Sequence, residues 1–171
     1  MKSYEESCRQ LVRMELLDGL PQMPVRTPRY DDEEPLGVQF FRTGLEDADL
    51  SGLSLPRTFV CRSEFSGTKF NGSNLRECSF CWSDFVDADF SDADLTGSDL
   101  RASNYERVLF RGARLDGVDM RRSNFVGCDF TGASLRGAVL TREQKASLAL
   151  SEDQESSVVW ADEDGPEPDG G

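Results

Sequence analysis

The most regular feature of the chain is an apolar residue at every fifth position from Leu45 to Leu140. The residue two positions before each apolar centre is small in nearly every repeat, and the residue between them is often Asp or Asn. Neither a helix, with about 3.6 residues per turn, nor a strand, with alternating faces, produces this spacing. The pattern therefore indicates a structural repeat, which has to be identified before helices and strands are assigned.

Side-chain identity also repeats every twenty residues, which is four of the five-residue units. The columns are Leu55, Leu75, Leu95, Leu115 and Leu135; Phe70, Phe90, Phe110 and Phe130; Phe65, Phe85, Tyr105 and Phe125; and Ser63, Ser83, Ser103 and Ser123. Turns of four units would place like residues above one another at a strand spacing of about 4.8 Å. Aromatic rings would then stack, and serine hydroxyls would hydrogen-bond between turns. The columns predict a solenoid whose lumen is filled by leucine and phenylalanine.

The five-residue unit resembles the A(D/N)LXX motif of the pentapeptide-repeat family. Residues 88–97, with the sequence ADFSDADLTG, match this motif in consecutive repeats. The resemblance implies a right-handed quadrilateral β-helix with four pentapeptides per coil. Residues 38–140 are then expected to form about five coils. The predicted fold class is an all-β solenoid with short α-helical caps at both ends.

The flanking segments carry signals of a different kind. Ser3–Glu6 is a capping box and predicts a helix, followed by an irregular connector rich in proline and charge, so residues 1–37 form an N-terminal capping region. A second capping box at Thr141–Gln144 predicts a C-terminal capping helix over residues 141–150. Residues 151–171 are mostly Ser, Asp, Glu, Gly and Pro, and we expect them to be disordered.

The net charge of −13 is concentrated near the C-terminus. Residues 141–171 hold nine acidic and two basic residues, whereas residues 38–140 hold 15 acidic and 12 basic residues. This distribution favours solubility and disfavours direct binding to nucleic acid. Because the sequence shows no apolar run of membrane-spanning length and no signal peptide, we expect a cytoplasmic protein without a membrane partner. Five cysteines without a disulfide-like spacing are consistent with reduced thiols.

The sequence offers no catalytic constellation. It contains no histidine, the commonest general base and metal ligand. Cys78 and Cys81 have the spacing of a metal or redox motif, but the repeat register directs Cys78 inward and Cys81 outward as an exposed thiol. Cys61 and Cys81 share an outward column within bridging range, although a cytosolic setting disfavours a disulfide. The aspartates at 84–99 would suit carboxylate catalysis or Ca²⁺, or would bond to nearby backbone. We favour the last interpretation and predict no enzyme activity, cofactor or metal.

The strongest candidate site lies on the outward positions around the column of Val60, Phe80, Leu100 and Met120. We call it the aromatic–arginine face, and its residues are Phe59, Arg62, Cys81, Trp82, Arg101, Arg121 and Arg122. Outward aromatic residues beside arginines are typical of protein-binding hot spots. The alternative is a stabilising stripe in which the arginines cover Trp82.

A second candidate is a short apolar motif within the acidic C-terminal region, Val158, Val159 and Trp160. An aromatic cluster in a disordered acidic segment is typical of a linear recognition motif. The alternative is that these residues have no role in binding.

These features predict a non-enzymatic protein that binds and neutralises or shields a protein partner such as a toxin. The resemblance implies an immunity, resistance or adaptor role. The alternative that it implies is a DNA mimic that protects the topoisomerase DNA gyrase from quinolones or toxins. The short solenoid and its small charge weigh against that alternative, which would use Leu148 and Leu150 of the C-terminal helix as a homodimer contact. The sequence does not identify the partner.

Overall fold

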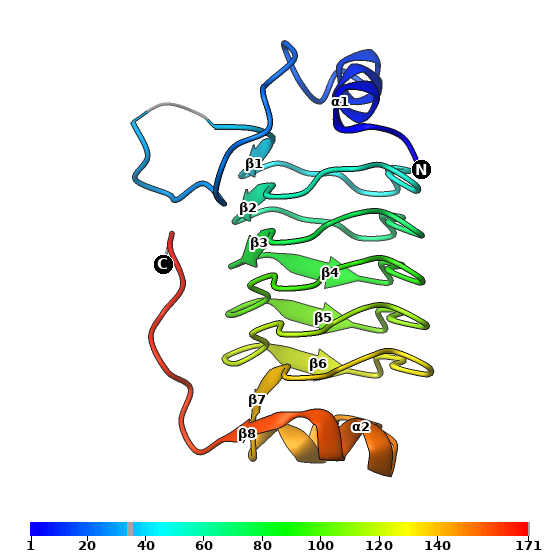
Figure 1. Ribbon diagram of the computed structural model, residues 1–171, viewed down its shortest axis with the longest axis vertical. Coiled ribbons are helices and arrows are strands. Elements are labelled where there is room, and N and C mark those ends of the chain that lie inside the picture. The colour runs from blue at the N-terminus through cyan, green and yellow to red at the C-terminus, as the bar shows by residue number, and fades with distance from the viewer. Residues whose placement is uncertain (34–35, 171) are drawn as a thin grey trace.

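The repeats wind into a β-solenoid of about six turns (Figure 1). The computed structural model describes residues 1–33 and 36–170, so residues 34–35 of the predicted connector and Gly171 lie outside the described part. Residues twenty positions apart pair in parallel, as Val60 does with Phe80. The predicted fold class is therefore confirmed, with one turn more than the expected five.

Three small parallel sheets mark the sides of the solenoid. The first contains β1 (Gln39–Phe41), β2 (Phe59–Cys61) and β3 (Ser79–Cys81). The second contains β4 (Asp84–Val86), β5 (Asn104–Glu106) and β6 (Asn124–Val126). The third pairs β7 (Val139–Thr141) with β8 (Val159–Ala161). Figure 1 shows β1–β3, β7 and β8 stacked along one side, with β4–β6 on another.

The lumen is filled by the columns that the sequence predicts. The rings of Phe65 and Phe85 stack at 4.9 Å, and those of Phe85 and Tyr105 stack at 5.0 Å. The Ser63 amide donates to the Ser83 hydroxyl one turn away at 3.1 Å, and the pattern repeats along the serine column. Because the inward side chains are buried and their hydroxyls are bonded, another molecule can contact the solenoid only on its outer faces.

The N-terminal end is covered as the capping box predicts. Helix α1 (Tyr4–Arg13) begins after Ser3, whose side chain accepts the Glu6 amide. Its buried face includes Cys8 and Leu11, which belong to the core. Among the described residues, no helix is long and apolar enough to cross a membrane.

The C-terminal end differs from the predicted helix over 141–150. Only a short 3-10 helix, η1 (Gln144–Ser147), forms there, and the α-helix α2 (Glu152–Ser157) follows it. The Gln144 amide nitrogen donates to the carbonyls of Met120 and Ser123, both at 2.9 Å. The chain is therefore fixed against the end of the solenoid, where a continuing α-helix would lift it away.

Helix α2 closes the same end in an equivalent way. Its own capping box joins Ser151 and Gln154, and the Gln154 amide nitrogen donates to the carbonyls of Phe130 and Ala133 at 2.7 and 3.0 Å. Gln144 and Gln154 are ten residues apart, which is half a turn of the solenoid. They therefore donate hydrogen bonds to backbone carbonyls on two different sides of the turn beneath them. Such capping protects an open β-edge.

The expectation of disorder over 151–171 is wrong for the described residues. Strand β8 continues the twenty-residue register, with Trp160 opposite Leu140. Val158 is buried in the core. The apolar residues 158–160 therefore complete a sixth turn, and the solenoid extends over residues 38–161. Beyond Ala161 the chain reverses and runs along the outside of the solenoid toward its N-terminal end (red in Figure 1).

Candidate protein-binding face

The aromatic–arginine face is built on one corner of the solenoid. Strands β2 and β3 occupy the same position in successive turns of the solenoid. In each turn, the residue that directly follows this position adopts a left-handed backbone conformation. These residues are Arg62 (φ 52°), Trp82 (φ 55°), Ala102 (φ 55°) and Arg122 (φ 61°). Non-glycine residues seldom adopt this conformation, so the flanking hydrogen-bond ladder must hold it. The result is a column of side chains, one per turn, along the corner.

Two residues of the predicted face are not on its surface. Phe59 is buried, and the connector lies close by, since the Arg57 side chain donates to the carbonyl of Pro24 at 2.9 Å. Cys81 is fully buried, which contradicts the expected exposed thiol, and its Sγ lies 3.2 Å from the Ser79 hydroxyl. Burial raises the pKa of the Cys81 thiol, so it is a poor nucleophile.

The cysteines are all free thiols in the structure. Cys61 and Cys81 are paired in register on neighbouring strands, as the repeat predicts. Cys78 lies in the core, so it cannot share a ligand with Cys81.

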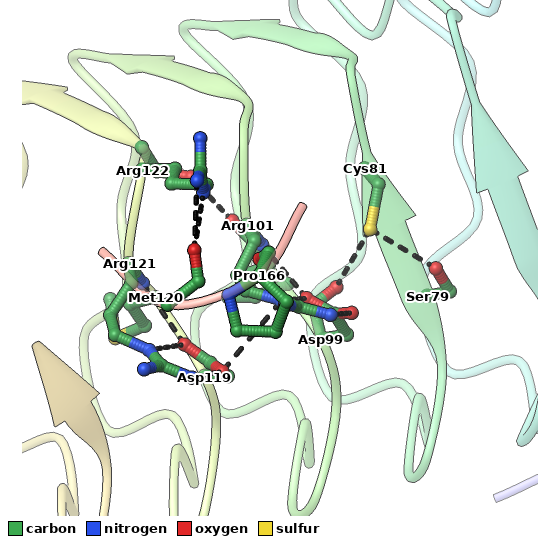
Figure 2. A network of polar contacts seen from close by, with 12 residues as sticks. Ser79, Cys81, Asp99, Arg101, Asp119, Met120, Arg121, Arg122 and Pro166 are labelled. Atoms are coloured by element: carbon green, nitrogen blue, oxygen red, sulfur yellow. Dashed lines mark hydrogen bonds and ion pairs between the residues drawn. The ribbon is translucent and has the colours of Figure 1, made fainter. Parts of the chain in front are cut away.

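Arg101 and Arg121 are held in place by aspartates at the motif position. Figure 2 shows this network. Arg101 binds both carboxylate oxygens of Asp99, at 2.8 and 2.7 Å, and the hydrogen bond to Asp99 raises the pKa of the guanidinium. Arg121 binds Asp119 in the same way, at 2.9 and 2.7 Å. Such bidentate pairs fix the direction of the remaining N–H donors.

The remaining donors of the face bind the chain's own C-terminal segment, which we define as residues 162–170. Each successive turn of the solenoid donates to one of its backbone carbonyls. The contacts are Arg122 Nη2 to Gly165 O at 2.8 Å, Arg101 Nη1 to Pro166 O at 2.7 Å, Trp82 Nε1 to Pro168 O at 3.5 Å and Arg62 Nε to Gly170 O at 3.1 Å. In the turn whose corner residue is Ala102, which has no side-chain donor, the neighbouring Arg101 donates to the segment instead. Figure 2 shows the segment crossing Arg122 and Arg101.

The spacing of the segment matches the spacing of the turns. From Arg122 to Arg62 the corner rises by three turns, about 14 Å at the strand spacing. Residues 165–170 reach at most about 17 Å when extended. Gly170 sits so close to the corner that an added Cβ would lie 2.5 Å from the Cys61 sulfur. Close approach and a positive φ therefore both require glycine at this position.

The structure thus brings together four of the predicted face residues, Arg62, Trp82, Arg101 and Arg122, around a segment that sequence reasoning assigned to disorder. Arg121 lies against Gly165, where an added Cβ would overlap its guanidinium. The signal that could have found the segment is the register of residues 158–160. That register delivers Ala161 to the corner that Thr141 occupies one turn earlier.

The second predicted motif is not an exposed linear motif. Val158 lies in the core and Trp160 packs against it, with Lys145 Nζ 5.5 Å from the Trp160 ring. Only Val159 is largely exposed. Leu148 and Leu150, the predicted dimer contact, are partly buried against the core of the same chain.

These features define a repeat protein of the β-solenoid class, whose aromatic–arginine face is the candidate binding site. The family model described as pentapeptide repeats matches residues 45–80, 63–101 and 106–142, with eight copies. The chain belongs to the pentapeptide-repeat family. Proteins of this family are generally structural or binding proteins without enzyme activity.

A comparison with solved structures finds several similar proteins. A pentapeptide repeat protein from the Arabidopsis thaliana thylakoid lumen is 31% identical, covering 67% of this chain and 72% of that chain, with a TM-score of 0.46. HetL, involved in heterocyst differentiation regulation in the cyanobacterium Nostoc sp. strain PCC 7120, is 22% identical, covering 60% of this chain and 48% of that chain, with a TM-score of 0.38. QnrB1, a plasmid-mediated fluoroquinolone resistance protein, is 18% identical, covering 60% of this chain and 74% of that chain, with a TM-score of 0.32. A comparison with curated protein sequences finds no match.

Proposed function

We propose that this protein is a non-enzymatic binding module that neutralises or shields a protein partner, in an immunity, resistance or adaptor role. It contacts this partner through the aromatic–arginine face. We place this activity in the cytoplasm, as the sequence predicts. The filled lumen supports the proposal, because a solenoid with a packed interior can recognise other molecules only through its surfaces.

One observation carries the proposal: the face already holds a stretch of extended polypeptide. Three arginines and the Trp82 indole donate to four carbonyls of the C-terminal segment. Arg101 is fixed independently of this segment, because Asp99 binds its guanidinium through both carboxylate oxygens and its side chain is 15% exposed. Fixed donors lose little entropy on binding, which is the general advantage of a preorganised site.

The test places a photo-crosslinking amino acid on the face in the producing cell. Position 102, on the same corner between Trp82 and Arg122, samples the aromatic–arginine face without replacing one of its side-chain donors. Position 92, half a turn away, samples the opposite corner, where Asp92 is exposed. We expect one protein to crosslink from position 102 and not from position 92. The affinity of this purified protein is then measured with the wild-type chain and with Trp82→Ala/Arg101→Glu.

The double variant should lower the affinity by at least about tenfold, because hot-spot residues each contribute about 2 kcal/mol or more. The matched control is Arg114→Glu/Arg136→Glu, which reverses two exposed arginines elsewhere on the solenoid. Equal affinities of the Trp82/Arg101 variant and the wild type would show that the partner binds another face.

The alternative, protection of DNA gyrase by a DNA mimic, is supported by one feature of the structure. The acidic C-terminal segment lies along the solenoid (Figure 1), so this acidity belongs to the side of the solenoid and does not extend beyond it. A gyrase supercoiling assay with a fluoroquinolone tests this alternative. Restored supercoiling would favour it, and absence of protection at a large excess of protein would exclude it.

A further inference from the structure

We propose that the C-terminal segment, residues 162–170, is an intramolecular ligand of the aromatic–arginine face, and that this face recognises extended, proline-containing segments by their backbone carbonyls. A partner of the proposed function would then present a segment of the same kind and would have to displace the C-terminal segment. The first part stands without the proposed function, and the second part rests on it.

The contacts show what the face recognises. All four donors of the face bind main-chain oxygens, and two of these oxygens belong to Pro166 and Pro168. Proline has no amide hydrogen, so a proline-containing segment offers carbonyls with few donors that need partners. Proline also favours the extended conformation before binding. Binding of proline-rich segments in this preformed conformation to surfaces lined by aromatic side chains is an established mode of peptide recognition.

The acidic side chains contribute less to these contacts. Glu167 reaches Arg122 only at 3.9 Å and its side chain is 63% exposed. Asp162 pairs with Arg142 at 2.9 Å, but both side chains are largely exposed. Exposed pairs of this kind contribute at most about 1 kcal/mol. The acids therefore attract the segment toward the arginines, and the carbonyls decide how it is seated.

The segment is attached in a way that permits release. Within the described part of the chain, residues 162–170 take part in no hydrogen bond between backbone groups. A cavity of about 340 Å³ remains beside the segment, bounded by Asp169, Arg101 and connector residue Thr27. The six turns of the solenoid are complete at Ala161, where the β7–β8 pairing ends. Removal of the segment therefore leaves every strand pair in place.

Attachment to the same chain sets a limit on the affinity. A short linker holds a ligand at an effective concentration of about 1 mM. For the segment to be mostly bound, the free peptide must bind the vacant face with a dissociation constant below about 1 mM. A partner that competes for the face would bind the intact chain more weakly than the vacant one, in proportion to the fraction of vacant face.

The experiment follows the indole N–H resonance of Trp82 by NMR, with Trp160→Phe used to assign it. A chain ending at Ala161 is compared with the intact chain, after thermal unfolding has shown that both retain the same transition. The probe is the amidated peptide DEDGPEPDG, which is residues 162–170. We expect the indole resonance to move on truncation, and to return toward its original position as the peptide is added. The intact chain should show no response to the same peptide.

Two altered peptides identify what is recognised. In DEDGAEADG both prolines are alanine, and in NQNGPQPNG all acids are amides. We expect the first change to weaken binding by at least about fivefold at 0.15 M salt, and the second to weaken it less. A greater loss with the amide peptide would overturn carbonyl recognition in favour of simple charge attraction. A dissociation constant above about 1 mM for the parent peptide would overturn the intramolecular ligand.

Two matched variants of the intact chain separate this inference from the proposed function. Arg101→Gln/Arg122→Gln removes donors of the face, and Arg114→Gln/Arg136→Gln removes two exposed arginines elsewhere. Only the first pair should shift the Trp82 resonance toward its position in the truncated chain. If the peptide binds as expected but the crosslinked partner binds equally well to Trp82→Ala/Arg101→Glu, the intramolecular ligand stands and the proposed function fails.

Discussion

Two adjoining parts of the acidic C-terminal region fold by different rules. Residues 159–161 form β8, which pairs with β7 through its backbone and places Trp160 in the column of Leu140. Residues 162–170 pair with no strand and are held by side chains of the aromatic–arginine face. Composition does not distinguish these parts, but periodicity does. The first part is a rung of the solenoid, whereas the second is a ligand on its surface.

The largest effect should follow removal of a core ring, which sets the energy scale for the repeats. Phe85 is fully buried and stacks between Phe65 and Tyr105. Phe85→Ala should lower the free energy of unfolding by about 3–5 kcal/mol through lost burial and a cavity. Urea unfolding followed by circular dichroism measures this loss. Val126→Ala, at an exposed position, is the control and should change the stability by less than about 0.5 kcal/mol.

A comparably small loss for Phe85→Ala would contradict the filled lumen. It would also remove the distinction between rungs and surface, because that distinction rests on how much each part buries.

The interior could be predicted almost completely from the sequence, because each column repeats the same packing problem in every turn. Stacked rings and the serine ladder follow from identity at a spacing of twenty residues. The ends could not be predicted in this way. Gln144 and Gln154 donate hydrogen bonds to carbonyls of residues more than twenty positions earlier in the chain, and no local sequence pattern indicates those partners.

The candidate site was predicted in part. Arg62, Trp82 and Arg122 follow from the repeat register, but the burial of Phe59 and Cys81 does not. The Cys81 sulfur is covered by its contacts with the Ser79 hydroxyl and the Asp99 carbonyl, which the register alone does not predict. The C-terminal segment was missed because its composition suits disorder, and its binding depends on donors of four different turns. The C-terminal segment is therefore ordered by its contacts with the aromatic–arginine face as much as by its own sequence.

The second effect concerns the end of the solenoid, between the rungs and the surface segment. Gln154→Glu keeps the capping-box acceptor but replaces the donor that binds the carbonyls of Phe130 and Ala133. We expect a loss of about 1–3 kcal/mol in the free energy of unfolding, because buried acceptors lose their partner. Gln22→Glu, at an exposed connector position, is the control. Equal stability of both variants would show that α2 does not cap the solenoid.

A smaller effect on global stability is expected when the surface segment is displaced. In Gly170→Ala the new Cβ would meet the Cys61 sulfur, so the end of the segment should leave the corner. The indole resonance of Trp82 should move, while the unfolding free energy changes by less than about 0.5 kcal/mol. Gly52→Ala is the matched control, since it also has a positive φ but an added Cβ would meet no atom within 4 Å.

Because Gly52 belongs to a solenoid turn, its substitution should lower the unfolding free energy by about 1 kcal/mol through backbone strain and should leave the Trp82 resonance unchanged. A reversed pattern, with Gly170→Ala destabilising the whole chain, would make the segment part of the solenoid. The comparison between rung and ligand would then fail.

The smallest effect is a pH dependence to which an aspartate of the repeats contributes. Hydrogen bonds from the Thr131 side chain and amide lower the pKa of Asp129 to about 2. Since this pKa lies below the ordinary value of 3.8, the stabilisation is present above pH 4 and is lost as the pH falls from about 4 to 2. Asp129→Asn, which keeps the repeat motif, should reduce the slope of stability over this range.

Thermal unfolding between pH 5 and pH 2 measures this slope in three chains: the wild type, Asp129→Asn and the chain ending at Ala161. The truncated chain loses five carboxylates, but residues 162–170 lie outside the strand ladder, so its slope should match that of the wild type. A slope that disappears on truncation would place the acid sensitivity in the C-terminal segment. In that case the segment would stabilise the solenoid directly, and its attachment would be coupled to folding of the whole chain.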